Sequence, residues 1–428
     1  MLMIWAVAAG RLRFPSAGHE GITGMPVIVQ TTNRLWQPFV ARHSDQGVVS
    51  MSSLSSLSPD PNSARKRLLV VQPLVGIGDM VWHKPWIDHL AGSFDLILAA
   101  KPTAHATTLF HGTNGIVDWL DIDRSMRGRK GRHDGLAGLF RLAADFRRAR
   151  ADAVLVLHHS ATYTLAACLA GIPLRWGYGI GSSRKWLNRG NFLGREARYE
   201  RPYRKLGRFA QANGFGLDQP HWQMAANDKA AQAVRAFCDD HNIKPDSSNG
   251  PDGRDMVVFG VGAMDAERQW PPSQFAQLAA AIRAEWPGLN IVLTGAPSEA
   301  SIVQAVLSDD AAPAGLIEKA GPLDEAVALI GSARAYIGND TSLLNIAATC
   351  GRPAVGFFAQ TEPLDYSDNI IPVALPDGRF GEAGAIRRIT VEQVFSVVAA
   401  TLNKPGNKPG KKPGNKPGKP PEKDRGDR

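Results

Sequence analysis

The stretch Leu68-Leu-Val-Val-Gln-Pro-Leu-Val-Gly-Ile-Gly-Asp-Met-Val-Trp-His-Lys-Pro-Trp86 joins a short apolar strand, a glycine-containing turn and the start of a helix. From residue 67 to 402, short apolar segments alternate with amphipathic segments of helical length, which is typical of parallel α/β units. Two Rossmann-like domains facing each other across a cleft are the economical architecture. We expect strands at 68–72, 96–99, 153–157, 257–260, 291–294, 335–337 and 354–358, and helices at 80–91, 136–149, 273–285, 299–307 and 343–350.

The chain of 428 residues is 44% hydrophobic and 21% charged, which is ordinary globular usage. The polar stretch 243–254 interrupts the α/β series and marks the expected domain boundary. We therefore expect a poorly patterned N-terminal extension and linker (1–66), an N-terminal Rossmann-like domain (67–250), a C-terminal Rossmann-like domain (251–402) and a disordered basic Lys-Pro-Gly tail (403–428). Met51 shortly precedes the first strand and is an alternative start to Met1.

No apolar run approaches the roughly 18 residues that a membrane span needs, so an integral membrane protein is not expected. The apolar residues 1–9 lack a preceding basic region, which argues against a signal peptide. The three cysteines lie far apart in apolar helical contexts, without metal-ligand spacing. The sequence therefore predicts a cytoplasmic protein with reduced cysteines.

The net charge of +9 is concentrated in a few segments. Residues 124–150 carry nine Lys or Arg against two Asp or Glu, residues 175–208 ten against two, and residues 404–428 nine against three. Such local basicity predicts a partner or substrate bearing phosphates or carboxylates, and the alternative is a solvated basic face. No nucleic-acid-binding signature accompanies these segments, so nucleic acid is not an expected partner.

The first loop carries candidate chemistry, because ligands of α/β sheets bind at the carboxyl ends of the strands. A dinucleotide fingerprint would place a third glycine at position 81, but after Gly76 and Gly78 that position is Val81. Nicotinamide binding is therefore disfavoured. Asp79 is expected to be the first residue or the cap of the following helix, and it is either a helix cap only or a functional carboxylate.

Three further loops follow strands of the second half. They read Val261-Gly-Ala-Met-Asp-Ala-Glu-Arg-Gln-Trp-Pro-Pro272, Gly295-Ala-Pro-Ser-Glu299 and Gly338-Asn-Asp-Thr-Ser-Leu-Leu-Asn-Ile-Ala-Ala348. With the first loop, their order and spacing resemble the family 9 glycosyltransferases, the heptosyltransferase-like enzymes of lipopolysaccharide core assembly. The likeness extends from about residue 67 to 402. It implies a GT-B fold with the acceptor on the N-terminal domain and the nucleotide sugar on the C-terminal one.

The resemblance also implies roles for particular residues. Asp79 would take the proton of the acceptor hydroxyl, and Arg268 would neutralise the leaving diphosphate in place of a metal. A helix beginning at 341–343 would offer its N-terminal N–H groups to the diphosphate. The implied catalytic residues are Asp79 and Arg268, the donor-binding residues are Gly262, Glu299, Asp340, Thr341, Ser342 and Asn345, and the acceptor-binding residues are Gly78, Tyr178, Arg184, Lys185 and Arg189.

Two positions depart from the family pattern, because Ser342 replaces a glycine and Asn345 a histidine. Ser342 adds a side chain beside the phosphates, and Asn345 cannot carry a proton's charge. The main expectation is an inverting glycosyltransferase that moves a sugar, heptose before others, from a nucleotide-diphosphate sugar to a lipopolysaccharide core or related surface glycan. A catalytically degenerate relative that binds nucleotide or glycan without turnover is the alternative, and a sugar-nucleotide epimerase or hydrolase is a third.

The expected partners are the nucleotide sugar as co-substrate and an anionic glycolipid acceptor. No cofactor and no metal are expected, although Asp121-Ile-Asp123 has the spacing of a metal motif. The expected location is the cytoplasm of a Gram-negative bacterium, with peripheral contact at the inner face of the inner membrane. The basic tail is expected to favour that contact.

Overall fold

The structure is a computed structural model that describes residues 65–125, 130–244 and 255–403. Almost all of the expected N-terminal extension, both candidate start methionines, the expected boundary at residue 250 and nearly all of the basic tail lie outside the described residues.

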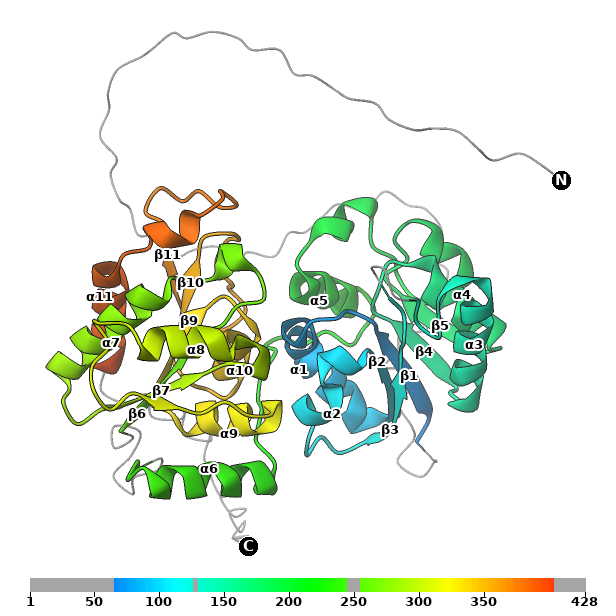
Figure 1. Cartoon of the computed structure of the whole chain (residues 1–428). Helices are drawn as coiled ribbons and strands as arrows, with labels where there is room; N and C mark the ends of the chain where they lie inside the picture. Colours follow the sequence, from blue (N-terminus) through cyan, green and yellow to red (C-terminus); the bar gives the residue numbers. More distant parts are fainter. Residues whose placement is uncertain (1–64, 126–129, 245–254, 404–428) are drawn as a thin grey trace, which may run out of the picture. The chain divides into compact units, whose positions relative to one another are not determined.

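Five parallel strands form the first sheet, in the order β3-β2-β1-β4-β5 (Figure 1). The expected strands at 68–72, 96–99 and 153–157 correspond to β1, β2 and β4. The sequence does not predict the two edge strands, because β3 carries aspartates and an exposed Trp119, and β5 is short and contains Arg175. The strands are β1 (Arg67–Gln72), β2 (Asp95–Ala100), β3 (Ile116–Asp121), β4 (Ala153–Val156) and β5 (Leu174–Gly177).

Six parallel strands form the second sheet, in the order β11-β10-β9-β6-β7-β8. The four expected strands of this half form its centre, and the outer strands β8 and β11 were not expected from their sequences, which are short or interrupted by proline. The strands are β6 (Met256–Gly260), β7 (Asn290–Thr294), β8 (Ile317–Glu318), β9 (Ala335–Asn339), β10 (Ala354–Phe358) and β11 (Ile370–Ala374).

Helices connect the strands of both sheets (Figure 1). The α-helices are α1 (Ile77–Ser93), α2 (Ala106–Leu109), α3 (Gly135–Arg148), α4 (Ala161–Leu169), α5 (Pro202–Ala212), α6 (Asp228–Asp240), α7 (Pro272–Glu285), α8 (Ala300–Leu307), α9 (Leu323–Ser332), α10 (Ser342–Thr349) and α11 (Val391–Leu402). The 3₁₀ helices are η2 (Pro102–Ala104), η3 (Gly181–Trp186), η4 (Arg195–Tyr199), η6 (Ala266–Arg268), η7 (Pro297–Glu299) and η8 (Ala385–Arg388).

Both faces of the first sheet are buried, which explains why its central strands are continuous apolar runs. Leu68 and Val70 of β1 pack on the side of α1 and α5, whereas Leu69 and Val71 pack on the side of α3 and α4. The alternation follows from the twofold period of a strand. The parallel α/β, GT-B-type fold expected from the sequence is confirmed.

Helix α6 belongs to the first half by sequence but packs against α9 of the second half. Asn227 caps α6 by accepting a hydrogen bond from the Ala230 N–H, and its amide donates to Asp324 in the first turn of α9 (3.0 Å). A boundary at residue 250 thus separates α6 from the helix that it contacts. Within the described ranges, no helix is both long and apolar enough to cross a membrane.

Candidate functional site

Asp79 lies in the first turn of α1, at the carboxyl edge of the first sheet. The helix begins at Ile77 with Gly76 as its cap, so the expectation that Asp79 is the first residue or the cap is wrong. Its carboxylate instead reaches back to accept a hydrogen bond from the Gly76 N–H (3.3 Å). Burial raises the pKa of Asp79, and this hydrogen bond partly opposes the shift. A carboxylate whose pKa is raised by partial burial is a stronger proton acceptor when ionised.

Helix α10 contacts α1 next to Asp79, through Asn345. The Asn345 side chain is 3% exposed, and its Oδ1 accepts hydrogen bonds from Trp82 Nε1 and Tyr366 Oη, both at 2.8 Å. Its Nδ2 donates to the Thr341 carbonyl (2.9 Å) and lies against Gly78. The first turns of α1 and α10 therefore meet, and Asn345 is engaged by protein groups in this structure.

A second polar cluster lies at the start of α10 and consists of Arg268, Asp340 and Thr361. Arg268 donates to the Asp340 carboxylate (3.1 Å), and so does the Thr361 hydroxyl (3.1 Å). Burial raises the pKa of Asp340, while the Arg268 charge and the Thr361 hydrogen bond lower it. Thr341 follows as the cap of α10 and Ser342 is its first residue, so the expected start at 343 is one residue late.

Glu299 and Gly262 come from different loops and lie in contact. The Glu299 carboxylate accepts a hydrogen bond from the Ala296 N–H (2.7 Å). A Cβ atom at position 262 would lie 2.1 Å from the Glu299 carboxyl carbon, so only glycine fits there without a shift of the glutamate. The structure thus brings together the loops after β6 and β7, as expected of two loops at one sheet edge.

Asn339 is a structural residue of this site that the sequence reasoning missed. Its Nδ2 donates to the carbonyls of Val261 (3.0 Å) and Gly262 (3.2 Å), and its Oδ1 accepts from the Trp270 N–H (3.0 Å). The side chain is fully buried. A polar residue ending an otherwise buried strand, immediately before Asp340, was the signal available in the sequence.

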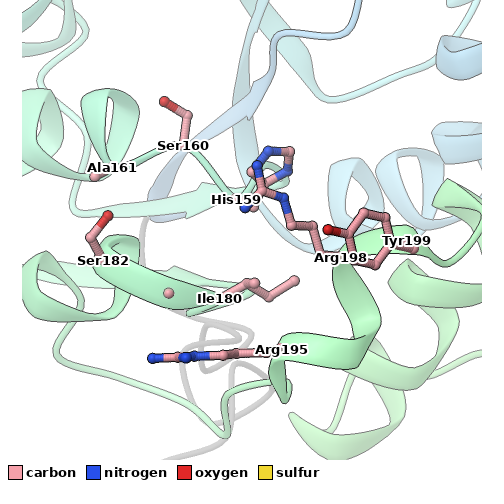
Figure 2. Close-up of a pocket in the computed structure, with 9 residues that line it drawn as sticks. His159, Ser160, Ala161, Ile180, Ser182, Arg195, Arg198 and Tyr199 are labelled. Carbon is pink, nitrogen blue, oxygen red and sulfur yellow. The ribbon is translucent and has the colours of Figure 1, made fainter. Parts of the chain in front are cut away.

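A cavity of about 580 Å³ opens at the carboxyl ends of β4 and β5 (Figure 2). Figure 2 shows the side chains of His159, Arg195 and Arg198 around it, from the loop after β4 and from 3₁₀ helix η4. Among the described residues, neither arginine has an acidic or hydrogen-bonding side-chain partner. The full lining is His159, Ser160, Ala161, Ile180, Gly181, Ser182, Arg195, Arg198 and Tyr199.

The charged side chains that line this cavity are cationic. Burial lowers the pKa of His158 to about 3, and the charges of His159 and Lys205 add to the shift. The pKa of His159 is also lowered, first by burial and then by Arg198 and Lys205. Both histidines are therefore neutral at pH 7, and the arginines carry the positive charge that faces the cavity.

The residues expected to bind the acceptor lie outside this lining. Tyr178 is buried, with its ring edge-on to Phe209, because it packs in the core rather than facing solvent. Arg184 stacks over the Phe192 ring (5.0 Å), and Lys185 and Arg189 are exposed. Sequence reasoning counted Arg195 and Arg198 within the basic segment but did not single them out, because only the fold brings 3₁₀ helix η4 beside His159.

Two parallel α/β sheets with polar loops gathered at their carboxyl edges define a GT-B-type protein. The family model of glycosyltransferase family 9 (heptosyltransferase) matches residues 139–374, more than half of the chain. The chain therefore belongs to glycosyltransferase family 9, and the resemblance stated from its motifs is confirmed.

Two curated relatives are named lipopolysaccharide heptosyltransferase 2. The protein of Escherichia coli is 28% identical over 236 residues, and that of Salmonella typhimurium is 26% identical over 236 residues. In each case the match covers 52% of this chain and 64% of the relative. The chain thus aligns with less than two thirds of the length of these relatives.

Solved structures support the fold. A glycosyl transferase family 9 protein from Veillonella parvula superposes with a TM-score of 0.62 at 18% identity, covering 79% of this chain and 97% of that one. The ADP-heptose lipopolysaccharide heptosyltransferase II of Escherichia coli gives a TM-score of 0.58 at 22% identity, covering 79% and 98%.

Proposed function

We propose that the chain is an inverting glycosyltransferase that moves a sugar, heptose before others, from a nucleotide-diphosphate sugar to a lipopolysaccharide core or related surface glycan. The observation that carries this proposal is the contact between the first turn of α1, which holds the half-buried Asp79 carboxylate, and α10, which begins beside Asp340. A proton acceptor and a helix start suited to phosphates thereby adjoin one site. Family membership and the names of the curated relatives support the choice of sugar and acceptor.

In this reaction, the acceptor hydroxyl oxygen attacks the anomeric carbon while the bond from that carbon to the diphosphate oxygen breaks. Asp79 takes the hydroxyl proton, and the nucleoside diphosphate leaves with the bonding electron pair. Attack opposite the leaving group inverts the anomeric centre. The donor side comprises Arg268 with the residues expected from the sequence, which are Gly262, Glu299, Asp340, Thr341, Ser342 and Asn345.

Arg268 supplies the fixed positive charge that the leaving diphosphate requires, and we propose that no metal or other cofactor is needed. In this structure its guanidinium is paired with Asp340, so the diphosphate would compete with that carboxylate. Transfer that persists in excess chelator would support metal independence, and transfer restored only by added Mg²⁺ or Mn²⁺ would contradict it.

The cavity beside His159 is the acceptor side of the proposed site. Arg195 and Arg198, which have no acidic side-chain partner in the part of the chain that the structure describes, suit phosphate or carboxylate groups on a glycolipid, since charged hydrogen bonds to such groups are strong. Arg184, Lys185 and Arg189 are exposed outside the lining and would meet more distant anionic groups. A glycolipid acceptor also supports the proposal that the chain is cytoplasmic and makes peripheral contact with the inner membrane.

The test is turnover with a panel of nucleotide sugars that includes ADP-heptose, with product configuration read by NMR. Formation of a glycosidic bond of inverted configuration supports the proposal, and retention of configuration contradicts the direct-attack mechanism. Hydrolysis or epimerisation of the donor without transfer would assign a different reaction to the same fold.

A degenerate binding protein is the second candidate, and a specific observation favours it. Asn345, Asp340 and Arg268 are engaged with protein groups rather than left open. Binding of a nucleotide sugar by calorimetry, with no transfer to any acceptor of the panel, would support this candidate.

A further inference from the structure

Helix α3 carries two large apolar side chains on its outer face. Leu136 is 80% exposed and Phe140 is 62% exposed. Their spacing of four residues places them one above the other on one side of the helix. The opposite side is anchored in the core by Leu142 and Phe146. Scattered exposed apolar residues are normal, but an adjacent pair on a helix that already has a buried face is not required for folding.

Three cations lie close to this pair in the sequence. Lys130, Arg132 and Arg141 are exposed, and Lys130 and Arg141 have no acidic partner among the described residues, whereas Arg132 pairs with Asp145. The other acid of the segment, Asp134, pairs with Arg124 and accepts hydrogen bonds from backbone N–H groups. We name the set Lys130, Arg132, Leu136, Phe140 and Arg141 the α3 patch. It is positively charged with an apolar centre, and it belongs to the basic segment 124–150, which the proposed reaction does not use.

The α3 patch lies toward the ligand-binding edge of the first sheet. Strand β3 ends at Asp121, and α3 precedes the parallel strand β4, so α3 begins at the carboxyl edge of the sheet. Helix α3 packs beside α4, and Figure 1 shows the two helices side by side. The first residue of α4, Ala161, lines the cavity that holds Arg195 and Arg198. A surface bound to the patch would therefore be close to that cavity.

We propose that the α3 patch docks on an anionic lipid surface, with Leu136 and Phe140 entering the boundary between headgroups and acyl chains and with Lys130, Arg132 and Arg141 meeting lipid phosphates. Apolar side chains flanked by cations suit such an interface, because the bilayer offers hydrocarbon beside negative charge. An acidic protein would match the cations but offers no comparable reason for a protruding phenylalanine. The proposal concerns lipid binding alone and does not depend on sugar transfer.

The test is sedimentation of the full chain with vesicles. Vesicles of mixed phosphatidylglycerol and phosphatidylcholine are compared with vesicles of phosphatidylcholine alone. We expect the parent chain to bind the anionic vesicles and the double variant Leu136→Ser/Phe140→Ser to bind them about tenfold more weakly, because each apolar side chain no longer leaves water. The matched control is Met264→Ser, which removes a fully exposed apolar side chain from the second half of the chain and should bind as the parent does.

The basic residues of the tail can also attract anionic vesicles, so the measurement is repeated at high salt. Salt screens that attraction but not the apolar contribution, and the ratio between parent and double variant should therefore persist. Equal binding of parent and double variant, equal losses in the double variant and in Met264→Ser, or no binding of the parent chain to anionic vesicles would each overturn the proposal. A melting temperature equal to the parent's establishes that the double variant is folded.

Discussion

The indole N–H of Trp82 donates a hydrogen bond to the side-chain oxygen of Asn345, with 2.8 Å between Nε1 and Oδ1. An indole can only donate, so this contact fixes which end of the amide faces α1. The Tyr366 hydroxyl donates to the same oxygen, which leaves the amide nitrogen free to donate to the Thr341 carbonyl. One side chain thereby joins the helix of Asp79 to the cap of α10.

Asn345→Asp should destabilise the chain, because a carboxylate cannot donate to the Thr341 carbonyl and would bring a buried charge. We expect a loss of about 1–3 kcal/mol in the free energy of unfolding, measured with chemical denaturant. The control Trp82→Phe removes only one hydrogen-bond donor to Asn345, so it should lower the free energy of unfolding by less. A variant Asn345→Asp as stable as the parent would mean that the amide N–H group contributes nothing.

Asp79→Asn should lower sugar transfer by about 10²–10⁴-fold, the usual contribution of a general base. The amide keeps the size of the side chain and can still accept the hydrogen bond from the Gly76 N–H, so stability should change little. Donor affinity by calorimetry should stay within a few-fold. The control is Asp88→Asn on the same helix, which removes a carboxylate paired with Lys84 and should transfer normally. Near-parent transfer by Asp79→Asn would reduce Asp79 to a structural residue of the first turn.

Arg268→Ala should weaken binding of the nucleoside diphosphate by about 10–100-fold, since hydrogen bonds to charged groups contribute roughly 1.5–3 kcal/mol. Arg268→Lys keeps the charge without the two-pronged geometry and should recover part of the affinity. Calorimetry with the nucleoside monophosphate provides the comparison. This ligand lacks the second phosphate, so Arg268→Ala should weaken its binding less than that of the diphosphate. Equal losses for both nucleotides would place Arg268 away from the diphosphate.

The central strands were predictable because both faces of each sheet are covered, and burial on both sides produces continuous apolar runs. Edge strands such as β3 and β5 have one side open to solvent. Their polar residues interrupt the continuous apolar run from which a strand is predicted. The start of α1 was placed three residues late, since Gly76 and Gly78 suggest a loop. Gly78 nevertheless lies inside the helix and Gly76 is its cap, with Asp79 supporting the first turn.

The candidate site was predictable where one loop carries several of its residues, as at 338–348. It was not predictable where the contact joins distant segments. Nothing in the sequence around Arg198 indicates that it lies beside His159, because 38 residues separate the two and only the path of the chain through α4, β5 and η3 brings them together. Tyr178 shows the opposite failure, because an aromatic residue in a basic segment suggested a ligand surface and the fold buries it.

The paired variant Arg195→Gln/Arg198→Gln should raise the KM for an anionic acceptor by about tenfold or more and weaken its salt dependence, with donor KM unchanged. The comparison variant Arg184→Gln/Lys185→Gln removes two cations outside the cavity and should have a smaller effect. A larger effect for the second variant would move the acceptor from the cavity to the loop, as the sequence alone suggested.

His83 predicts a pH dependence of stability. Its Nδ1 lies 2.6 Å from the Asp79 carbonyl oxygen, which can only accept, so Nδ1 carries the proton of the neutral ring. Burial lowers the pKa of His83 to about 4, well below its ordinary value of 6.5. Between these two values the unfolded chain binds a proton that the folded chain does not. The free energy of unfolding should therefore fall as the pH is lowered from about 6.5 to 4, by at most about 1.4 kcal/mol per pH unit from this residue.

The variant His83→Gln cannot take up that proton, so its stability should fall less steeply over the same range, whatever its stability at pH 7. The control His89→Gln replaces an exposed histidine of the same helix and should keep the parent slope. Denaturant unfolding at a series of pH values measures all three slopes. Carboxylates such as Asp145 and Asp365, whose pKa values are lowered, contribute mainly below this range and leave the comparison clear. Parallel curves for parent and His83→Gln would show that His83 does not stay neutral in the folded chain.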